Sequence, residues 1–203
     1  MQTQHKGRLA AAALLMGLAG AAQAHTGHGT HSLMEGLAHP FGLDHLLAML
    51  AVGVWSVSAL PQSKAWWGPA TFLLALVASA ALGAAGVSVP YLEQTIALSV
   101  VLFGAMLVLA SRAAPALPVA VGLGLIAAAS SLHGLAHGAE TPATGFAGYA
   151  AGFMLTTAVL HIGGVGMGLV IRRWMGQRSG AVLGGLGAVL GAAGLVLFGQ
   201  LAA

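Results

Sequence analysis

Two short motifs of this sequence place histidines beside carboxylates. The first reads HPFGLDH and the second LHGLAHGAE, and their ionisable residues are His39, Asp44, His45, His133, His137 and Glu140. His133 and His137 stand four residues apart, so on a helix they share one face and can both reach one ion. Imidazole with carboxylate suits nickel, cobalt, copper or zinc, whereas magnesium and calcium need more oxygen ligands. The two motifs therefore predict a transition-metal site.

Three further histidines extend this prediction, and each has an alternative reading. His25 and His28 belong to the stretch HTGHGTH, which can catch a divalent metal or serve as a His-rich end without a defined site. His161, in AVLHIGG, has no ionisable neighbour in the sequence. It can act as a relay for an ion, or form a hydrogen bond between helices. Asp44 can likewise ligate a cation directly or orient a ligating imidazole, and His133 and His137 can simply bind water at a membrane interface.

The composition predicts an all-α integral membrane protein. Of the 203 residues, 58% are hydrophobic and only 5% are charged, whereas about a quarter are charged in an average soluble domain. A membrane helix needs about 20 largely apolar residues. Reading the sequence on that scale gives six spans, at residues 42–60, 66–86, 91–111, 117–136, 147–171 and 180–201. Short connections between these spans predict one six-transmembrane-helix bundle.

The first 24 residues have the pattern of a cleaved signal peptide. Lys6 and Arg8 precede a short apolar stretch, and Ala22-Gln23-Ala24 resembles a signal peptidase site. We therefore predict a signal peptide at residues 1–24, a periplasmic His-rich segment at 25–41 and the six-helix transmembrane domain at 42–203. An uncleaved first membrane helix is the alternative.

The loop charges predict the orientation in the membrane. Basic residues in short loops mark the cytoplasmic side, and the basic residues beyond the signal peptide all fall in the first, third and fifth loops: Lys64, Arg112, Arg172, Arg173 and Arg178. With the mature N-terminus in the periplasm, these loops are cytoplasmic. We therefore expect a multi-pass protein of a bacterial inner membrane, with both histidine motifs at or beside the outer ends of spans.

The sequence resembles the HupE/UreJ family of hydrogenase and urease accessory proteins. The segments GLAHPFGLDHLLAMLAVGVWS, LHGLAHGAE and GFMLTTAVLHIGGVG follow one another in the family's order. The resemblance implies a nickel or cobalt permease, with the ion ligated by residues of the two motifs and by His161. It also implies nickel metallochaperones or metalloenzyme maturation proteins as partners. Four residues separate His39 from Asp44, one fewer than is usual in this family, and this spacing resembles the broader nickel/cobalt transporter family.

Three classes of function follow from these observations. The first is a secondary permease that carries Ni²⁺ or Co²⁺ from periplasm to cytoplasm, since no nucleotide-binding loop is present to use ATP. The second is a membrane-anchored periplasmic buffer or chaperone that binds metal without transporting it. The third is a membrane enzyme with haem or a histidine-ligated metal oxygenase centre. We expect the first, with no enzymatic activity, no resident cofactor and no nucleic-acid partner. The absence of cysteine excludes thiolate ligands.

Overall fold

The computed structural model describes residues 33–112, 117–141 and 146–202, and within these ranges it contains helices and no strand. The predicted signal peptide, together with His25 and His28, lies outside the described residues. Short elements come first: α2 (Leu33–Ala38) and a 3-10 helix at His39–Phe41. The six longer helices are α3 (Leu43–Ala59), α4 (Trp67–Ala84), α5 (Leu92–Ala110), α6 (Val119–Ala139), α7 (Phe146–Met175) and α8 (Ser179–Ala202). Two further 3-10 turns, at Gln62–Lys64 and Gly176–Arg178, join α3 to α4 and α7 to α8.

Each of the six predicted spans corresponds to one of the longer helices. The largest difference is at the end of α7, predicted at residue 171 and observed at Met175. By length and apolar composition, four helical segments of the described chain can cross a membrane, one of them being the continuous stretch Phe146–Ala202 that includes both α7 and α8. The number becomes five if the bent pair Leu33–Phe41 and Leu43–Ala59 counts as one crossing. The described part of the chain is therefore all-α, with the apolar helices of a multi-pass membrane protein.

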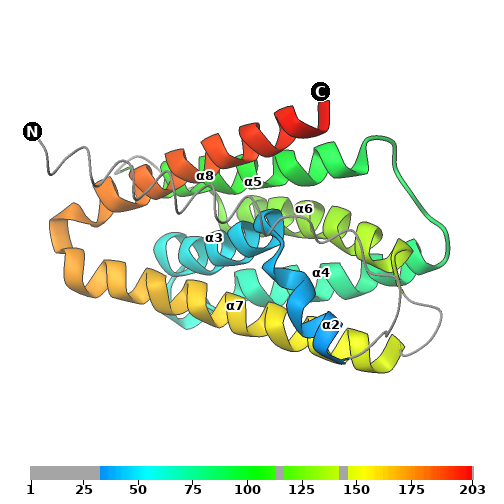
Figure 1. Cartoon of the computed structure of the whole chain (residues 1–203). Helices are drawn as coiled ribbons and strands as arrows, with labels where there is room; N and C mark the ends of the chain where they lie inside the picture. The colour runs from blue at the N-terminus through cyan, green and yellow to red at the C-terminus, as the bar shows by residue number, and fades with distance from the viewer. Residues whose placement is uncertain (1–32, 113–116, 142–145, 203) are drawn as a thin grey trace, which may run out of the picture.

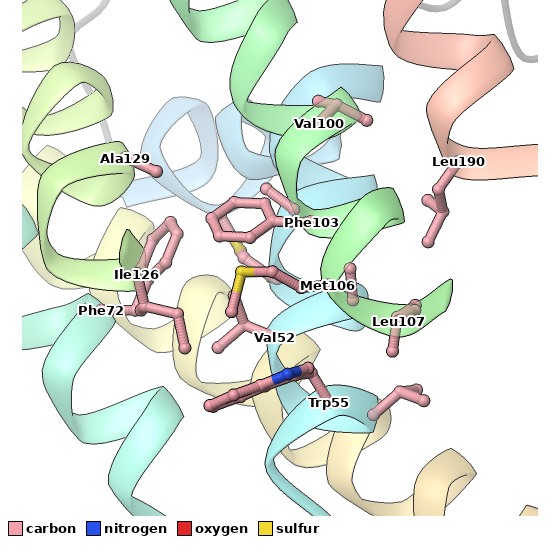
Figure 2. Close-up of a cluster of buried hydrophobic side chains, with 14 of the residues drawn as sticks. Val52, Trp55, Phe72, Val100, Phe103, Met106, Leu107, Ile126, Ala129 and Leu190 are labelled. Atoms are coloured by element: carbon pink, nitrogen blue, oxygen red, sulfur yellow. The ribbon is translucent and has the colours of Figure 1, made fainter. Parts of the chain in front are cut away.

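The helices pack mainly in pairs, α3 with α7, α4 with α6 and α5 with α8, and α3 also contacts α4 and α5 (Figure 1). The apolar core lies between these pairs. Phe72 of α4, Phe103 and Met106 of α5 and Trp55 of α3 converge there (Figure 2), and each is at most 2% exposed. Apolar side chains therefore fill the interior of the bundle around the middle and the C-terminal end of α3.

Charge separates to the two ends of the bundle. The helix directions place the five basic residues of the described chain at one end, around the ends of α3, α5 and α7: Lys64, Arg112, Arg172, Arg173 and Arg178. The four acidic residues of the sequence, Glu35, Asp44, Glu93 and Glu140, all lie at the opposite end. The histidine motifs are at this acidic end.

A bend at Pro40 and Gly42, where the sequence allows either a first helical turn or a chain break, directs the chain toward the histidines. The axes of Leu33–Phe41 and Leu43–Ala59 differ by 73°. Pro40 lacks a backbone N–H, and Gly42 has an extended ψ of 137°, so a continuous α-helix stops here. The short helix α2 then crosses α7 (Figure 1). Gly36 and Gly152 permit this crossing, because a Cβ atom on either would collide with the backbone of the other helix.

Candidate metal centre

Two groups of side chains offer ligand atoms close enough to hold one ion each. His45, His133 and His137 form the inner trio, and His39, His137 and Glu140 form the outer trio. Within each trio the ligand atoms lie within 4.8 Å of one another. Three histidines are a common ligand set for divalent transition metals. His137 belongs to both trios, so the two candidate sites overlap.

Hydrogen bonds join the four histidines of the two trios into one chain. His39 Nε2 lies 3.0 Å from His137 Nδ1, and His137 Nε2 lies 2.7 Å from His45 Nε2. His45 Nδ1 lies 3.2 Å from His133 Nδ1. The two nitrogens of His137 therefore face different partners, Nδ1 toward the outer trio and Nε2 toward the inner trio.

The repeated His-Gly pairs of α6 explain how this helix presents both imidazoles. His133 and His137 point into the bundle one turn apart. Gly134 and Gly138, one position further along, face α4, where a Cβ atom would collide with the backbone of Leu76 and Ala80 respectively. The glycines thus let α6 approach α4 closely, while the histidine before each glycine faces α3. The motif LHGLAHGAE encodes both the close packing and the ligand face.

The bend before α3 brings His39 to this site. Its ring contacts those of His137, Tyr149 and Phe153, with centroids 4.7, 5.7 and 5.7 Å away respectively. His39 and His137 are 98 positions apart in the sequence. The four-residue spacing from His39 to Asp44 is therefore compatible with His39 joining the outer trio.

The two carboxylates flank the histidines and are more exposed. Asp44 Oδ1 lies 3.9 Å from His45 Nδ1, and Glu140 Oε2 lies 3.7 Å from His137 Nδ1. Glu140 belongs to the outer trio, whereas Asp44 belongs to neither. Asp44 is in the first turn of α3, where its negative charge interacts favourably with the positive end of the helix dipole. Its charge is placed to attract a cation rather than to complete the inner trio.

Ser99 of α5 forms a hydrogen bond with His133 of the inner trio. The sequence analysis did not single out this serine. Its hydroxyl donates to the carbonyl of Ile96 at 2.7 Å and therefore accepts the hydrogen bond from His133 Nε2–H at 2.9 Å. A neutral imidazole carries one proton, so Nδ1 of His133 holds the lone pair and faces His45. Ser99 thus fixes the tautomer in which His133 can ligate an ion. A serine within an apolar span gave no local signal of this role.

His161 has its tautomer fixed in the same way but stands apart from both trios. Its Nδ1–H donates to the carbonyl of Thr157 at 2.8 Å. Nε2 therefore carries the lone pair, and this buried atom has no hydrogen-bond partner among the described residues. The alternative of a hydrogen bond between helices is not met among the described residues, because the hydrogen bond of this imidazole lies within α7. The Phe72 ring connects His161 with the inner trio, with centroids 4.8 Å from His161 and 5.9 Å from His133.

Exposure falls steadily from the outer trio inward. The side chain of Glu140 is 38% exposed, that of His137 is 12% exposed and that of His45 is 4% exposed. His133 is fully buried, and His161 is 1% exposed. An ion that arrives at Glu140 thus finds imidazoles at increasing depth.

Comparison with known proteins gives two matches. The family model described as "HupE / UreJ protein" matches residues 13–197. The protein named "Protein HupE" from Rhizobium leguminosarum bv. viciae is 37% identical over 177 residues, which cover 86% of this chain and 90% of that protein. No solved structure matches the chain.

Proposed function

The chain belongs to the HupE/UreJ family of hydrogenase and urease accessory proteins, and from this premise we propose that it is a secondary permease for Ni²⁺ or Co²⁺. It would carry the ion from periplasm to cytoplasm, where metallochaperones or maturation proteins of hydrogenase or urease take it up. The observation that carries the proposal is the overlap of two ligand trios at His137. Overlapping sites allow an ion to change ligands without leaving the protein.

Capture would begin at the outer trio. Glu140 supplies a negative charge at the acidic end of the bundle, which attracts a divalent cation. His39 and His137 supply the nitrogen ligands. The ion would displace the proton shared between His39 Nε2 and His137 Nδ1, because metal and proton compete for the same lone pairs.

Transfer inward would then use the other nitrogen of His137. Its Nε2 faces His45, which also contacts His133. The inner trio has three imidazoles and no carboxylate, so it favours Ni²⁺ or Co²⁺ over Mg²⁺ and Ca²⁺. Thus the outer trio would attract divalent cations, and the inner trio would select Ni²⁺ or Co²⁺ among them.

The next ligand would be Nε2 of His161. A buried lone pair without a partner costs free energy, and a passing cation would satisfy it. Phe72 contacts both His133 and His161 and is placed to control this step. Below lie buried apolar side chains, among them Trp55 and Met106, so release to the other side requires the helices to rearrange.

The proposal includes the finer topology predicted from the sequence. Six membrane spans would follow a signal peptide at residues 1–24, with the mature N-terminus in the periplasm of a bacterium. The segregation of basic residues to one end of the bundle supports this orientation. His25 and His28 would then lie on the same side as the outer trio and could deliver ions to it.

Nickel and cobalt uptake tests the proposal. Cells that lack other importers would express wild type, His45→Ala, His161→Ala or Ser131→Ala, and purified protein in vesicles would be assayed for entry of each ion. Ser131 is the control, because its hydroxyl bonds within α6 to the carbonyl of Ala127. We expect uptake to be lost in both histidine variants and kept in the control. Vesicles that admit neither ion under any gradient would contradict the proposal.

One observation favours a second function, a membrane-anchored metal buffer or chaperone. Buried apolar side chains fill the core beneath the inner trio, and this suits a protein that holds ions at one end without passing them on. His161→Ala separates the two functions. A buffer would keep metal bound through His45 and lose nothing with His161, whereas a permease would lose transport.

A further inference from the structure

A polar pocket lies at the end of the bundle opposite the histidines. It has a volume of about 440 Å³ and is lined by residues at the ends of α3, α5, α7 and α8. Its polar side chains are Ser58, Ser111, Arg112, Arg172 and Ser179. None of these residues takes part in the candidate metal centre.

The positive charge in this pocket has no carboxylate to balance it. The sequence has only four acidic residues, Glu35, Asp44, Glu93 and Glu140, and all four are at the other end of the bundle. Arg112 and Arg172 therefore face the pocket without an acidic side chain nearby among the described residues. Guanidinium groups bind carboxylates or phosphates with paired hydrogen bonds when such groups are available.

Arg172 is held in place by the end of a neighbouring helix. Its Nη1 donates to the carbonyl of Val57 at 2.8 Å, in the last turn of α3. The last carbonyls of a helix have no N–H partner within that helix, so they accept hydrogen bonds from outside it. A guanidinium has five N–H donors, so one hydrogen bond fixes the side chain and leaves others for a ligand.

The hydroxyls of the pocket define what kind of ligand fits. Ser58 donates to the carbonyl of Val54, and Ser111 donates to the carbonyl of Val108. Their protons are thus engaged within their own helices, and the donors for an anion come mainly from the two arginines. A compact anion with several acceptor oxygens matches this arrangement.

We propose that this pocket binds a phosphate group through Arg112 and Arg172. The group can belong to an anionic lipid headgroup or to free phosphate. The position favours the lipid, since basic pockets between membrane helices on the cytoplasmic side bind such headgroups, and this step rests on the topology proposed above, which puts this end of the bundle on that side. Binding there would link the ends of α3, α5, α7 and α8, the helices that border the pocket.

Binding measurements on the purified full-length protein, made without added metal ions, test this proposal. Phosphatidylglycerol, phosphatidylcholine and inorganic phosphate would be titrated separately into wild type and into Arg112→Gln, Arg172→Gln and Arg173→Gln, with affinity read from native mass spectrometry and thermal shift. Arg173 is the matched control, because it neighbours Arg172 on α7 but does not line the pocket. Arg112→Gln keeps the test decisive if loss of the Val57 contact impairs folding of Arg172→Gln.

We expect the Kd for phosphatidylglycerol to rise about tenfold in Arg112→Gln and Arg172→Gln, as loss of a charge-assisted hydrogen bond predicts, and to stay unchanged in Arg173→Gln. Saturation by inorganic phosphate with the same dependence on Arg112 would identify free phosphate as the ligand. The proposal is overturned if neither anionic probe binds wild type more tightly than phosphatidylcholine does. It is also overturned if Arg173→Gln weakens binding as much as Arg112→Gln.

Discussion

The Nε2 atoms of His137 and His45 lie 2.7 Å apart, so α6 and α3 meet through two imidazole rings. Only one of these nitrogens can carry the proton between them. With His133 Nδ1 held as an acceptor by Ser99, His45 carries its proton on Nδ1, and its Nε2 accepts from His137. Each lone pair of this chain therefore faces the N–H of the next imidazole, and an ion that binds the inner trio must displace the protons between the rings.

His137 is expected to matter most for metal affinity, because both trios include it. His137→Ala should weaken Ni²⁺ binding more than Glu140→Gln, which affects only the outer trio. We expect at least about a hundredfold loss for His137→Ala and about tenfold for Glu140→Gln, since loss of a direct ligand should cost at least as much as loss of an outer-shell partner, which costs about 10- to 100-fold. Isothermal titration of the purified protein measures both, and equal losses would contradict overlapping sites.

Ser99 should act through His133 rather than by touching the ion. Ser99→Ala leaves His133 Nε2–H buried without an acceptor, or lets the imidazole change tautomer. We expect Ni²⁺ affinity to fall about 10- to 100-fold and the free energy of unfolding to fall by about 1–3 kcal/mol. Ser99→Thr keeps the hydroxyl and should restore the affinity. The visible spectrum of bound Co²⁺ provides a readout that a loss of stability alone would not change.

Phe72 should influence transport more than binding, provided that the chain is a permease. Phe72→Leu keeps an apolar side chain but removes the ring contacts with His133 and His161. We expect the maximal uptake rate of Ni²⁺ to change while the binding affinity of the purified protein stays within about threefold of wild type. If affinity and uptake fall together, Phe72 merely supports the position of His133.

The close approach of α6 to α4 can be tested with two glycines of the same helix. A Cβ atom at Gly138 would collide with the backbone of Ala80, whereas a Cβ atom at Gly124 meets nothing within 4 Å. Gly138→Ala should lower Tm and Ni²⁺ affinity, with a stability loss of about 1–3 kcal/mol from overpacking.

Gly124→Ala is the control for that experiment. It should leave Ni²⁺ affinity unchanged and raise Tm slightly, because alanine has a helix propensity better than glycine by up to about 1 kcal/mol. Thermal unfolding with and without Ni²⁺ measures both variants. A Gly138→Ala protein as stable as the Gly124→Ala protein would contradict the packing described for α6.

Features that depend on local composition and spacing could be predicted from the sequence alone. Apolar runs of membrane-crossing length predicted the six longer helices. Backbone N–H and C=O groups must be paired within the segment in lipid, and a helix does this. The four-residue interval from His133 to His137 placed both on one face of α6. Alternation of basic loops predicted the separation of charge between the two ends of the bundle.

Which side chains meet could be learned only from the packing of the helices in three dimensions. The contact of His39 with His137 depends on a bend at Pro40 and on the crossing of α2 over α7, and neither follows from periodicity. Ser99 and Phe72 look like ordinary residues of apolar spans, and their relation to His133 arises because α4 and α5 pack on either side of it. Such contacts join residues far apart in the sequence, so they are determined by the packing of whole helices rather than by any local pattern.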